Sequence, residues 1–340
     1  MPRNPNTAQE EIRLMVRCAQ LYYGSRDHEW SQADIAKKLA INTTRVSRLL
    51  RRAQKEGIVR VEIVPPRLQK LEFELIDRYN LKDAVVVPSE HGQQKEAIGK
   101  AAADYFRRIA KDNLKICLAS GTTILKMIEN LGTLDFTGHS IYPMCSESTL
   151  VLKDFYPTQL ASFMMTKYRD PSKTTAYSYR LPVIPLETEM SSHYKEIFKI
   201  IIQSQAIQSL KKEAKSADIF FLGISSLKKP SAGFDSFSRA YYVDIQELKK
   251  ARIVGIINYQ PFNASGRIIS NKECNELHKY SDTMVMMRLE ELREAANAFG
   301  KYVIALAGGR HKVDAIRGAL KGRFFNVLIT DADVAEALIN

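Results

Sequence analysis

The chain has few of the features that mark secreted, membrane-spanning or metal-binding proteins. Among its 340 residues are only 4 cysteines, and they are scattered without metal-ligand spacing at Cys18, Cys117, Cys145 and Cys274. It has no apolar run long enough to span a membrane, and the N-terminal segment MPRNPNTAQEE has no apolar core typical of signal peptides. These absences predict a soluble, cytoplasmic protein with reduced thiols, no membrane contact and no bound metal.

Recognisable catalytic motifs are also missing. The sequence contains no HExxH, GxxxxGK[ST] or GxGxxG pattern and no Ser-His-Asp order. The six histidines are isolated from one another: His28, His91, His139, His193, His278 and His311. We therefore predict no catalytic residues and no cofactor.

Positive charge is in excess and is densest near the N-terminus. The formal net charge is +12, and residues 1–66 carry 12 Lys and Arg against 7 Asp and Glu. A chain of 340 residues suits one small and one large domain. The excess charge fits nucleic acid near the N-terminus, and in the remainder it fits a small anionic ligand equally well.

Residues 31–63 have the pattern of two short helices followed by a β-ribbon. Ser31 can cap a helix with apolar positions at helical spacing, residues 40–42 form a turn, and Asn42 or Thr43 can cap the second helix. Apolar residues at 59, 61 and 63 then alternate with Arg60 and Glu62, as in a half-buried strand. With the amphipathic segment 11–23 as a further helix, this predicts an N-terminal all-α winged helix-turn-helix domain over residues 1–66.

The outward positions of this domain predict contacts with double-stranded operator DNA. Arg45 and Arg48 lie in the early turns of the second helix, where guanidinium groups reach base edges in the major groove. Arg51, Arg52 and Arg60 are better placed for phosphates. An ordinary solvated helix face is the alternative interpretation of the arginines. The full predicted DNA-binding set is Ser31, Gln32, Thr43, Thr44, Arg45, Ser47, Arg48, Arg51, Arg52 and Arg60.

Residues 67–82 are predicted to form a connector helix after Pro65 and Pro66. Leu68, Leu71 and Leu75 fall on one side of it. This side can pair two copies of the chain in a homodimer or homotetramer, or it can pack against the large domain of its own chain. The pattern leaves both open.

Residues 83–340 alternate short apolar runs with longer helical ones. Strands are predicted at 84–87, 115–119, 140–144, 182–186, 217–223, 252–257, 302–307 and 326–330, and helices at 94–110, 122–131, 195–213, 288–299, 310–320 and 332–339. This alternation predicts a large α/β, Rossmann-like domain with a mostly parallel sheet. Residues 150–195 support no functional prediction.

Four loops that follow predicted strands, at 120–123, 223–227, 258–266 and 308–309, are candidates for ligand binding, because ligands of such sheets lie at the carboxyl ends of the strands. The loop at 120–123 opens a helix with free N–H groups and hydroxyls, which is typical of a phosphate cradle. Ordinary turn chemistry explains any one loop alone, but four at one edge favour a phosphorylated sugar. The predicted residues are Ser120, Gly121, Thr122, Thr123, Gly223, Ser225, Asn258, Gln260, Asn263, Gly308, Gly309 and Lys312.

The chain resembles the SorC/DeoR-type sugar-binding transcriptional regulators of bacteria over nearly its full length. The resemblance is carried by residues 14–23 and 31–63, by SGTT at 120–123, by ADIFFLGISSL at 217–227 and by residues 305–331. It implies an effector domain similar to sugar-phosphate isomerases and deaminases, phosphate contacts at Ser120–Thr123 with Lys312, and a homo-oligomeric repressor of a carbohydrate-utilisation operon.

The chain departs from the family pattern at the sugar end of the expected site. A family arginine and aspartate are replaced by Gln260 and Asn263, and Cys145–Ser148 stands where a Gly-Gly pair is common. Two alternatives therefore accompany the regulator hypothesis. The α/β domain is a sugar-phosphate isomerase or deaminase-like enzyme, or the protein is a constitutive DNA-binding regulator with a vestigial pocket.

Overall fold

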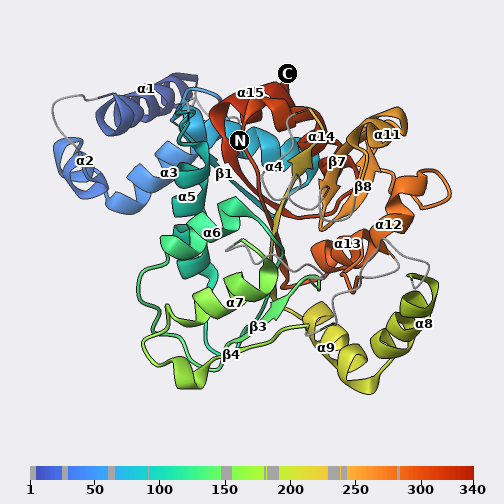
Figure 1. Ribbon diagram of the computed structural model, residues 1–340. Helices are drawn as coiled ribbons and strands as arrows, with labels where there is room; N and C mark the ends of the chain where they lie inside the picture. Colours follow the sequence, from blue (N-terminus) through green and yellow to red (C-terminus); the bar gives the residue numbers. More distant parts are fainter. Residues whose placement is uncertain are drawn as a thin grey trace. The chain divides into compact units, whose positions relative to one another are not determined.

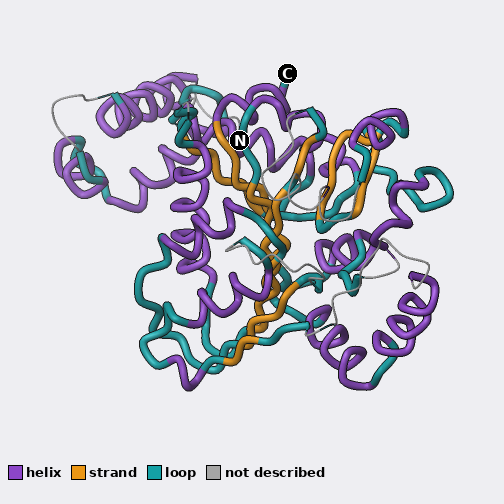
Figure 2. Tube along the Cα trace, viewed as in Figure 1, coloured by secondary structure: helices purple, strands orange, loops and turns teal. Residues whose placement is uncertain are grey.

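A computed structural model gives the fold (Figure 1). It describes residues 5–24, 30–59, 66–90, 92–146, 155–179, 181, 191–228, 238, 243–281 and 284–340. The chain divides into two compact units, residues 1–64 and 65–340. Figure 2 shows the contrast between them: helices and loops make up the described part of the first unit, and strands are confined to the second.

The first unit packs three helices around a small apolar core. The helices are α1 (Pro5–Tyr23), α2 (Gln32–Lys38) and α3 (Thr43–Lys55). Met15 from α1, Ile35 from α2 and Val46 from α3 are fully buried against one another. The predicted ribbon residues 60–63, with Arg60, lie outside the described residues.

Side-chain caps fix where α2 and α3 begin. The Asp34 N–H donates to Ser31 Oγ at 3.1 Å, and the Ser31 N–H donates back to the Asp34 carboxylate at 3.2 Å. Asn42, rather than Thr43, caps α3, because its Oδ1 accepts from the Arg45 N–H at 2.7 Å. Between the helices Ala40 has a left-handed backbone, with φ of 52°.

The second unit is built on a parallel sheet of seven strands in the order β1-β10-β9-β5-β2-β3-β4. Every neighbouring pair is parallel, so the prediction of a mostly parallel α/β sheet is confirmed. The strands are β1 (Asp83–Val87), β2 (Lys115–Leu118), β3 (Ser140–Pro143), β4 (Thr175–Ala176), β5 (Ile219–Gly223), β9 (Tyr302–Leu306) and β10 (Val327–Asp331).

Helices cover both faces of this sheet. On one side lie α5 (Gln94–Ile109), α6 (Thr122–Glu129) and α7 (Pro157–Met165), and on the other lie α9 (Gln205–Lys215) and α13 (Leu289–Asn297) (Figure 1). Further helices are α4 (Arg67–Tyr79), α8 (Ser191–Ile202), α11 (Ile245–Lys250), α12 (His278–Ser281), α14 (Val313–Lys321) and α15 (Ala332–Ile339), with 3-10 turns η1 (Pro171–Lys173), η2 (Asn275–Leu277) and η3 (Arg310–Lys312).

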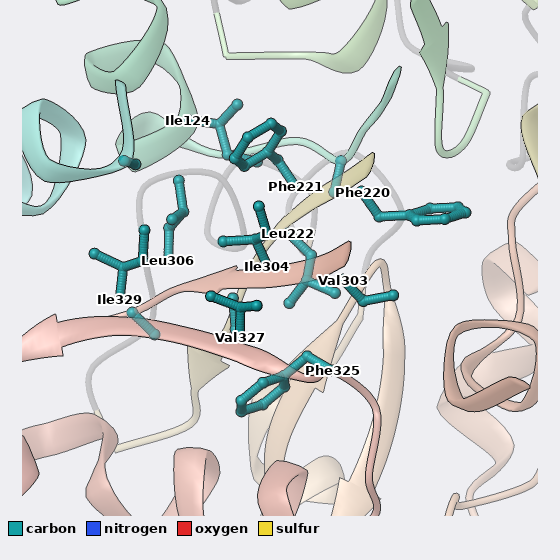
Figure 3. Close-up of a cluster of buried hydrophobic side chains, with 14 of the residues drawn as sticks. Ile124, Phe220, Phe221, Leu222, Val303, Ile304, Leu306, Phe325, Val327 and Ile329 are labelled. Atoms are coloured by element: carbon teal, nitrogen blue, oxygen red, sulfur yellow. The ribbon is translucent and has the colours of Figure 1, made fainter. Parts of the chain in front are cut away.

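The central strands are apolar because both of their faces are covered. Phe221, Ile304 and Val327 are among the side chains that fill this core, drawn in Figure 3, and all three are fully buried. Ile124 reaches the same core from the first turn of α6. Burying this turn fixes the start of α6 relative to the ends of β2 and β5.

The connector helix α4 packs against its own α/β unit. Leu75 is fully buried, the Tyr79 hydroxyl donates to the Leu338 carbonyl at 2.8 Å, and the Val86 N–H donates to the Glu72 carboxylate at 2.9 Å. Phe73, on another side of the helix, is 56% exposed in the single chain. Within one chain α4 therefore packs against the large domain, and the pairing of two copies through this helix stays a prediction.

The structure corrects three expectations. Residues 252–257 form β7 (Ile253–Ile257), which belongs to a separate antiparallel sheet with β6 (Ser225–Ser226) and β8 (Gln260–Asn263) and not to the main sheet. Residues 258–266 are therefore not one loop. The helix expected at 195–213 is two helices, α8 and α9, because the backbone extends at Ser204, with ψ of 146°. The strand expected at 182–186 lies outside the described residues.

Candidate functional site

A small cavity lies where the chain order of the main sheet reverses. From β2 the chain continues outward to β3, whereas from its neighbour β5 it continues toward β9 on the other side. The loops after β2 and β5 therefore diverge and leave a crevice at the carboxyl ends of the strands. The cavity has a volume of about 60 Å³ and is lined by residues of both loops.

The start of α6 supplies hydrogen-bond donors to this cavity. The first intrahelical bond runs from the Leu125 N–H to the Gly121 carbonyl at 3.0 Å, so the N–H groups of the three residues before Leu125 have no helical acceptor. Within the described residues the hydroxyls of Ser120, Thr122 and Thr123 also have no hydrogen-bond partner. These donors and the positive end of the helix dipole suit an anion.

Lys312 brings a positive charge to the same cavity from the end of η3. Among the described residues its ammonium group has no hydrogen bond or ion pair. Burial and the nearby charge of Lys95 lower the pKa of Lys312 to about 8, and the carboxylate of Asp331 acts in the opposite direction. An anion in the cavity would supply the counter-charge that Lys312 lacks.

The segment that carries Lys312 is held by Asp331, a buried carboxylate at the end of β10. Its Oδ2 accepts from the Gly309 N–H at 2.6 Å, and its Oδ1 caps α15 by accepting from the Val334 N–H at 3.0 Å. A Cβ on Gly308 would lie 2.4 Å from the same Oδ2, so only glycine allows this close approach.

The wall opposite α6 is the tight turn between β7 and β8. Asn258 and Tyr259 both have left-handed backbones, with φ of 47° and 63°. Asn258 is buried, and its Nδ2 donates to the carbonyls of Met287 at 2.9 Å and Met144 at 3.3 Å. Its Oδ1 is buried and has no partner among the described residues, so it remains free to accept from a ligand hydroxyl.

The structure brings together eight of the predicted effector residues and leaves four outside the cavity. Those that line it are Ser120, Gly121, Thr122, Thr123, Gly223, Ser225, Asn258 and Lys312. Gln260 binds the Met287 carbonyl and the Leu289 N–H instead, and Asn263 closes its own turn by accepting from Ser265 and Arg267. Gly308 and Gly309 shape the Lys312 segment without lining the cavity.

Several residues of the site were not predicted. Ile124, Ile224, Ile256, Tyr259 and Leu306 complete the lining. Asp331 was also missed as the residue that holds the Lys312 segment. Its place directly after an apolar strand and before a helix, within TDAD, is the signal that could have revealed it.

In the first unit, α3 presents the predicted arginines in two different states. Arg45, Arg48 and Arg51 are exposed and have no ion pair within the described residues. Arg52 instead pairs with Glu11 at 2.9 Å and with Glu56 at 2.5 Å. Of the other predicted residues, Ser31, Thr43 and Thr44 are exposed, whereas Gln32 and Ser47 are half-buried.

The described residues contain no cluster of three or more His, Cys, Asp or Glu side chains that could hold a metal ion. Among the described helices, none is long and apolar enough to cross a membrane. All four cysteines are buried, and none of them forms a disulfide in the part of the chain that the structure describes.

Fold and cavity together define an α/β protein with a cavity, lined by the start of α6, at the switch point of its sheet. Residues 66–340 match the sugar-binding domain family over most of the chain, and the protein belongs to that family.

Two further proteins are similar in sequence to this one over nearly its whole length. The chain is 26% identical to the sorbitol operon regulator of Klebsiella pneumoniae, covering 97% of this chain and 98% of that protein. It is also 26% identical to the deoxyribonucleoside regulator of Bacillus subtilis, with the same coverage of 97% and 98%.

Solved structures show the same fold. The full-length sorbitol operon regulator SorC of Klebsiella pneumoniae matches with a TM-score of 0.68 at 26% identity, covering 97% of this chain and 100% of that one. A DeoR family transcriptional regulator from Listeria monocytogenes matches 80% of this chain and 100% of its own, with a TM-score of 0.65 at 23% identity.

Proposed function

We propose that this protein is a DNA-binding transcriptional regulator of a carbohydrate-utilisation operon. The observation that carries the proposal is the match of residues 66–340 to the sugar-binding domain family, joined to a helical unit with an exposed arginine face. Two relatives that span nearly the whole chain are named as a sorbitol operon regulator and a deoxyribonucleoside regulator. In this proposal residues 1–66 are a winged helix-turn-helix domain, residues 67–82 connect and pair protomers, and residues 83–340 bind the effector.

In the DNA-binding unit, α3 is the recognition helix. Arg45 and Arg48 are exposed in its first two turns and contact guanine edges in the major groove. Arg51 is exposed one turn further on and contacts a phosphate. Arg52 pairs with Glu11, which ties α3 to α1, and its contact with a phosphate stays a prediction.

The effector is a phosphorylated sugar or polyol bound in the cavity at α6. Its phosphate accepts hydrogen bonds from the first N–H groups of α6 and from the hydroxyls of Thr122 and Thr123, and Lys312 provides the balancing charge. The free Oδ1 of Asn258 accepts from a hydroxyl of the sugar. Binding changes how the protomers of a homo-oligomer pair, and so releases the repressor from its operator.

An enzymatic role receives less support from the cavity. A sugar-phosphate isomerase or deaminase needs a carboxylate or imidazole base beside the sugar. The described lining residues include neither group. We therefore propose that the site binds its ligand without turnover.

A vestigial pocket is favoured by one specific observation. The side chains of Gln260 and Asn263, which replace the charged residues of the family pattern, make only contacts within the protein. A constitutive DNA-binding protein would show no response to any phosphosugar.

A gel-shift experiment on the DNA upstream of the protein's own gene distinguishes these functions. The full chain is titrated at one fixed salt concentration, with and without a panel of sugar phosphates, against scrambled DNA of equal length. A complex weakened or strengthened by one compound supports the regulator. Tight specific binding that no compound changes supports the constitutive protein, and absence of specific binding contradicts both.

A further inference from the structure

A second and much larger cavity lies in the α/β unit, about 600 Å³ in volume. It is bounded by the end of α8, by α9, by the start of β8 and by residues within 268–281 and 284–290. The cavity at α6, at about 60 Å³, holds little more than one small group. Pockets for small molecules are typically about 300–1,000 Å³, so the larger cavity has room for a whole ligand, whereas the cavity at α6 has room for the phosphate group of one.

The lining of the large cavity combines an apolar floor with a cationic rim. Buried side chains such as Leu277, Met284 and Met286 form the floor. Lys199, Lys211, Lys272 and Arg288 also line it, and none of the four has an ion pair within the described residues. Burial lowers the pKa of Lys211, and the nearby carboxylate of Glu291 acts in the opposite direction. A bound anion would favour the protonated form of Lys211. Glu290 is the single carboxylate among the described lining residues.

The two cavities share a wall made of Asn258, Tyr259 and Gln260. Tyr259 lines both of them, and its carbonyl accepts from the Tyr280 hydroxyl at 2.8 Å on the side of the large cavity. Asn258 lines the small cavity and Gln260 the large one, and both donate to the Met287 carbonyl, at 2.9 and 2.7 Å. A change on one side of this wall therefore alters contacts on the other.

We propose that the large cavity is a second binding site, that it takes an amphipathic organic anion, and that its occupancy is coupled to anion binding at α6 through the wall 258–260. The apolar floor favours an aromatic or aliphatic body, and the unpaired cations favour a carboxylate, sulfonate or phosphate. The binding itself is independent of the proposed regulatory function, whereas the coupling rests on the phosphate site of that function.

The probe 1-anilinonaphthalene-8-sulfonate tests the site, because it joins an aromatic body to one negative charge. Titrated into the full chain, its fluorescence should saturate at one probe per chain. Lys211→Gln and Arg288→Gln should each weaken binding about five- to tenfold, as expected for loss of a charge-assisted contact. Lys212→Gln is the matched control, since Lys212 is adjacent and exposed but does not line the cavity, and it should change nothing.

Three results would overturn the proposal. Equal probe affinity in all the variants, with unchanged thermal unfolding, would place the probe elsewhere. Equal affinity for the neutral N-phenyl-1-naphthylamine would remove the requirement for an anion. Full competitive displacement by inorganic phosphate, abolished in Thr122→Glu, would put the probe in the small cavity.

The coupling has its own measurement. Saturating inorganic phosphate should change the probe affinity without abolishing binding, and an unchanged affinity would contradict the coupling. Calorimetry with phosphate alone distinguishes absence of coupling from failure of the proposed function. If the proposed function fails, phosphate gives no binding heat, although the probe still binds in the large cavity.

Discussion

The carboxylate of Asp331 holds the backbone of Gly309 through a 2.6 Å hydrogen bond, three residues before the lysine that faces the candidate effector site. The same carboxylate caps α15. Asp331 thus joins the stability of the C-terminal helix to the position of Lys312.

Asp331→Asn should reduce both stability and anion affinity. The new amide cannot satisfy both N–H groups, which costs about 1–3 kcal/mol of unfolding free energy, measured by chemical denaturation. Phosphate binding should weaken as the Lys312 segment shifts. The control is Asp333→Asn, because Asp333 pairs with the exposed Arg310 at 3.2 Å and should contribute under about 1 kcal/mol. Equal effects of the two variants would contradict this role of Asp331.

Phosphate affinity should fall as the pH rises through about 8, because burial lowers the pKa of Lys312 to about 8. Binding needs the protonated ammonium, and inorganic phosphate is almost wholly dianionic above about pH 8. Calorimetry of inorganic phosphate between about pH 8 and 10 therefore measures the effect of Lys312. Lys312→Gln should bind weakly with a nearly flat profile, and a flat profile in the natural protein would argue against this contact.

The unfolding free energy should also depend on Lys312, but it should increase with pH, whereas the phosphate affinity decreases. Since the folded pKa of Lys312 lies below its ordinary value of 10.5, the unfolded chain binds more protons between about pH 8 and 10.5. The contribution of Lys312 to the unfolding free energy therefore rises across that window. Comparison of denaturation midpoints with Lys312→Gln isolates it, and identical pH slopes would rule it out.

Thr122→Glu should abolish the effector response while leaving operator binding intact. The substitution places a carboxylate where the first turn of α6 would hold a phosphate, so it repels the ligand. Thr122→Val is the matched variant, because it removes the hydroxyl but keeps the N–H groups, and its affinity should fall only modestly. Gel shifts with the active compound measure both. A surviving response in Thr122→Glu would mean that the cradle is assigned wrongly.

Arg48→Ala should cost about 1–3 kcal/mol of binding free energy on the cognate operator and relax base preference at one position. Arg52→Ala should affect base preference little, because its guanidinium is engaged by Glu11 and Glu56. Fluorescence anisotropy with cognate and scrambled duplexes measures both variants. Equal loss on the two duplexes would assign Arg48 to phosphate rather than to a base.

Ala40→Gly should stabilise the helical unit by about 0.5–1 kcal/mol. A non-glycine residue with φ of 52° is strained, and glycine is not. The same substitution at Ala33, inside α2, should destabilise by a similar amount. Hydrogen exchange of the α2 and α3 amides in the full chain reports both effects, and a loss of protection in Ala40→Gly would contradict the strain.

The parts of the fold that depend on local pattern could be predicted from the sequence. The apolar runs of β1, β2, β5, β9 and β10 are short and bounded by turns, and both faces of a parallel strand are buried, so their composition reveals them. Ser120–Thr123 was identifiable as part of the site because a strand, a small-residue loop and a helix follow one another directly.

Features that depend on distant contacts could not be predicted in this way. The polar segment 258–266 reads as a loop, yet Asn258 and Tyr259 turn the chain so that β8 pairs back on β7. Gln260 is buried there only because Met287 and Leu289, far along the sequence, supply partners for its amide. The half-buried position of Lys312 likewise depends on the segments after β2, β5 and β9, which line one cavity together.

The edge position of β1 has a consequence for synthesis on the ribosome. Among the described strands β1 pairs only with β10, in register from Asp83 with Val327 to Val87 with Asp331. The helical unit is made of residues 1–64 alone. The strand β1, in contrast, has no neighbouring strand until residues 327–331 have been synthesised. A premature stop codon before position 327 would therefore release a chain able to complete its helical head but not its sheet.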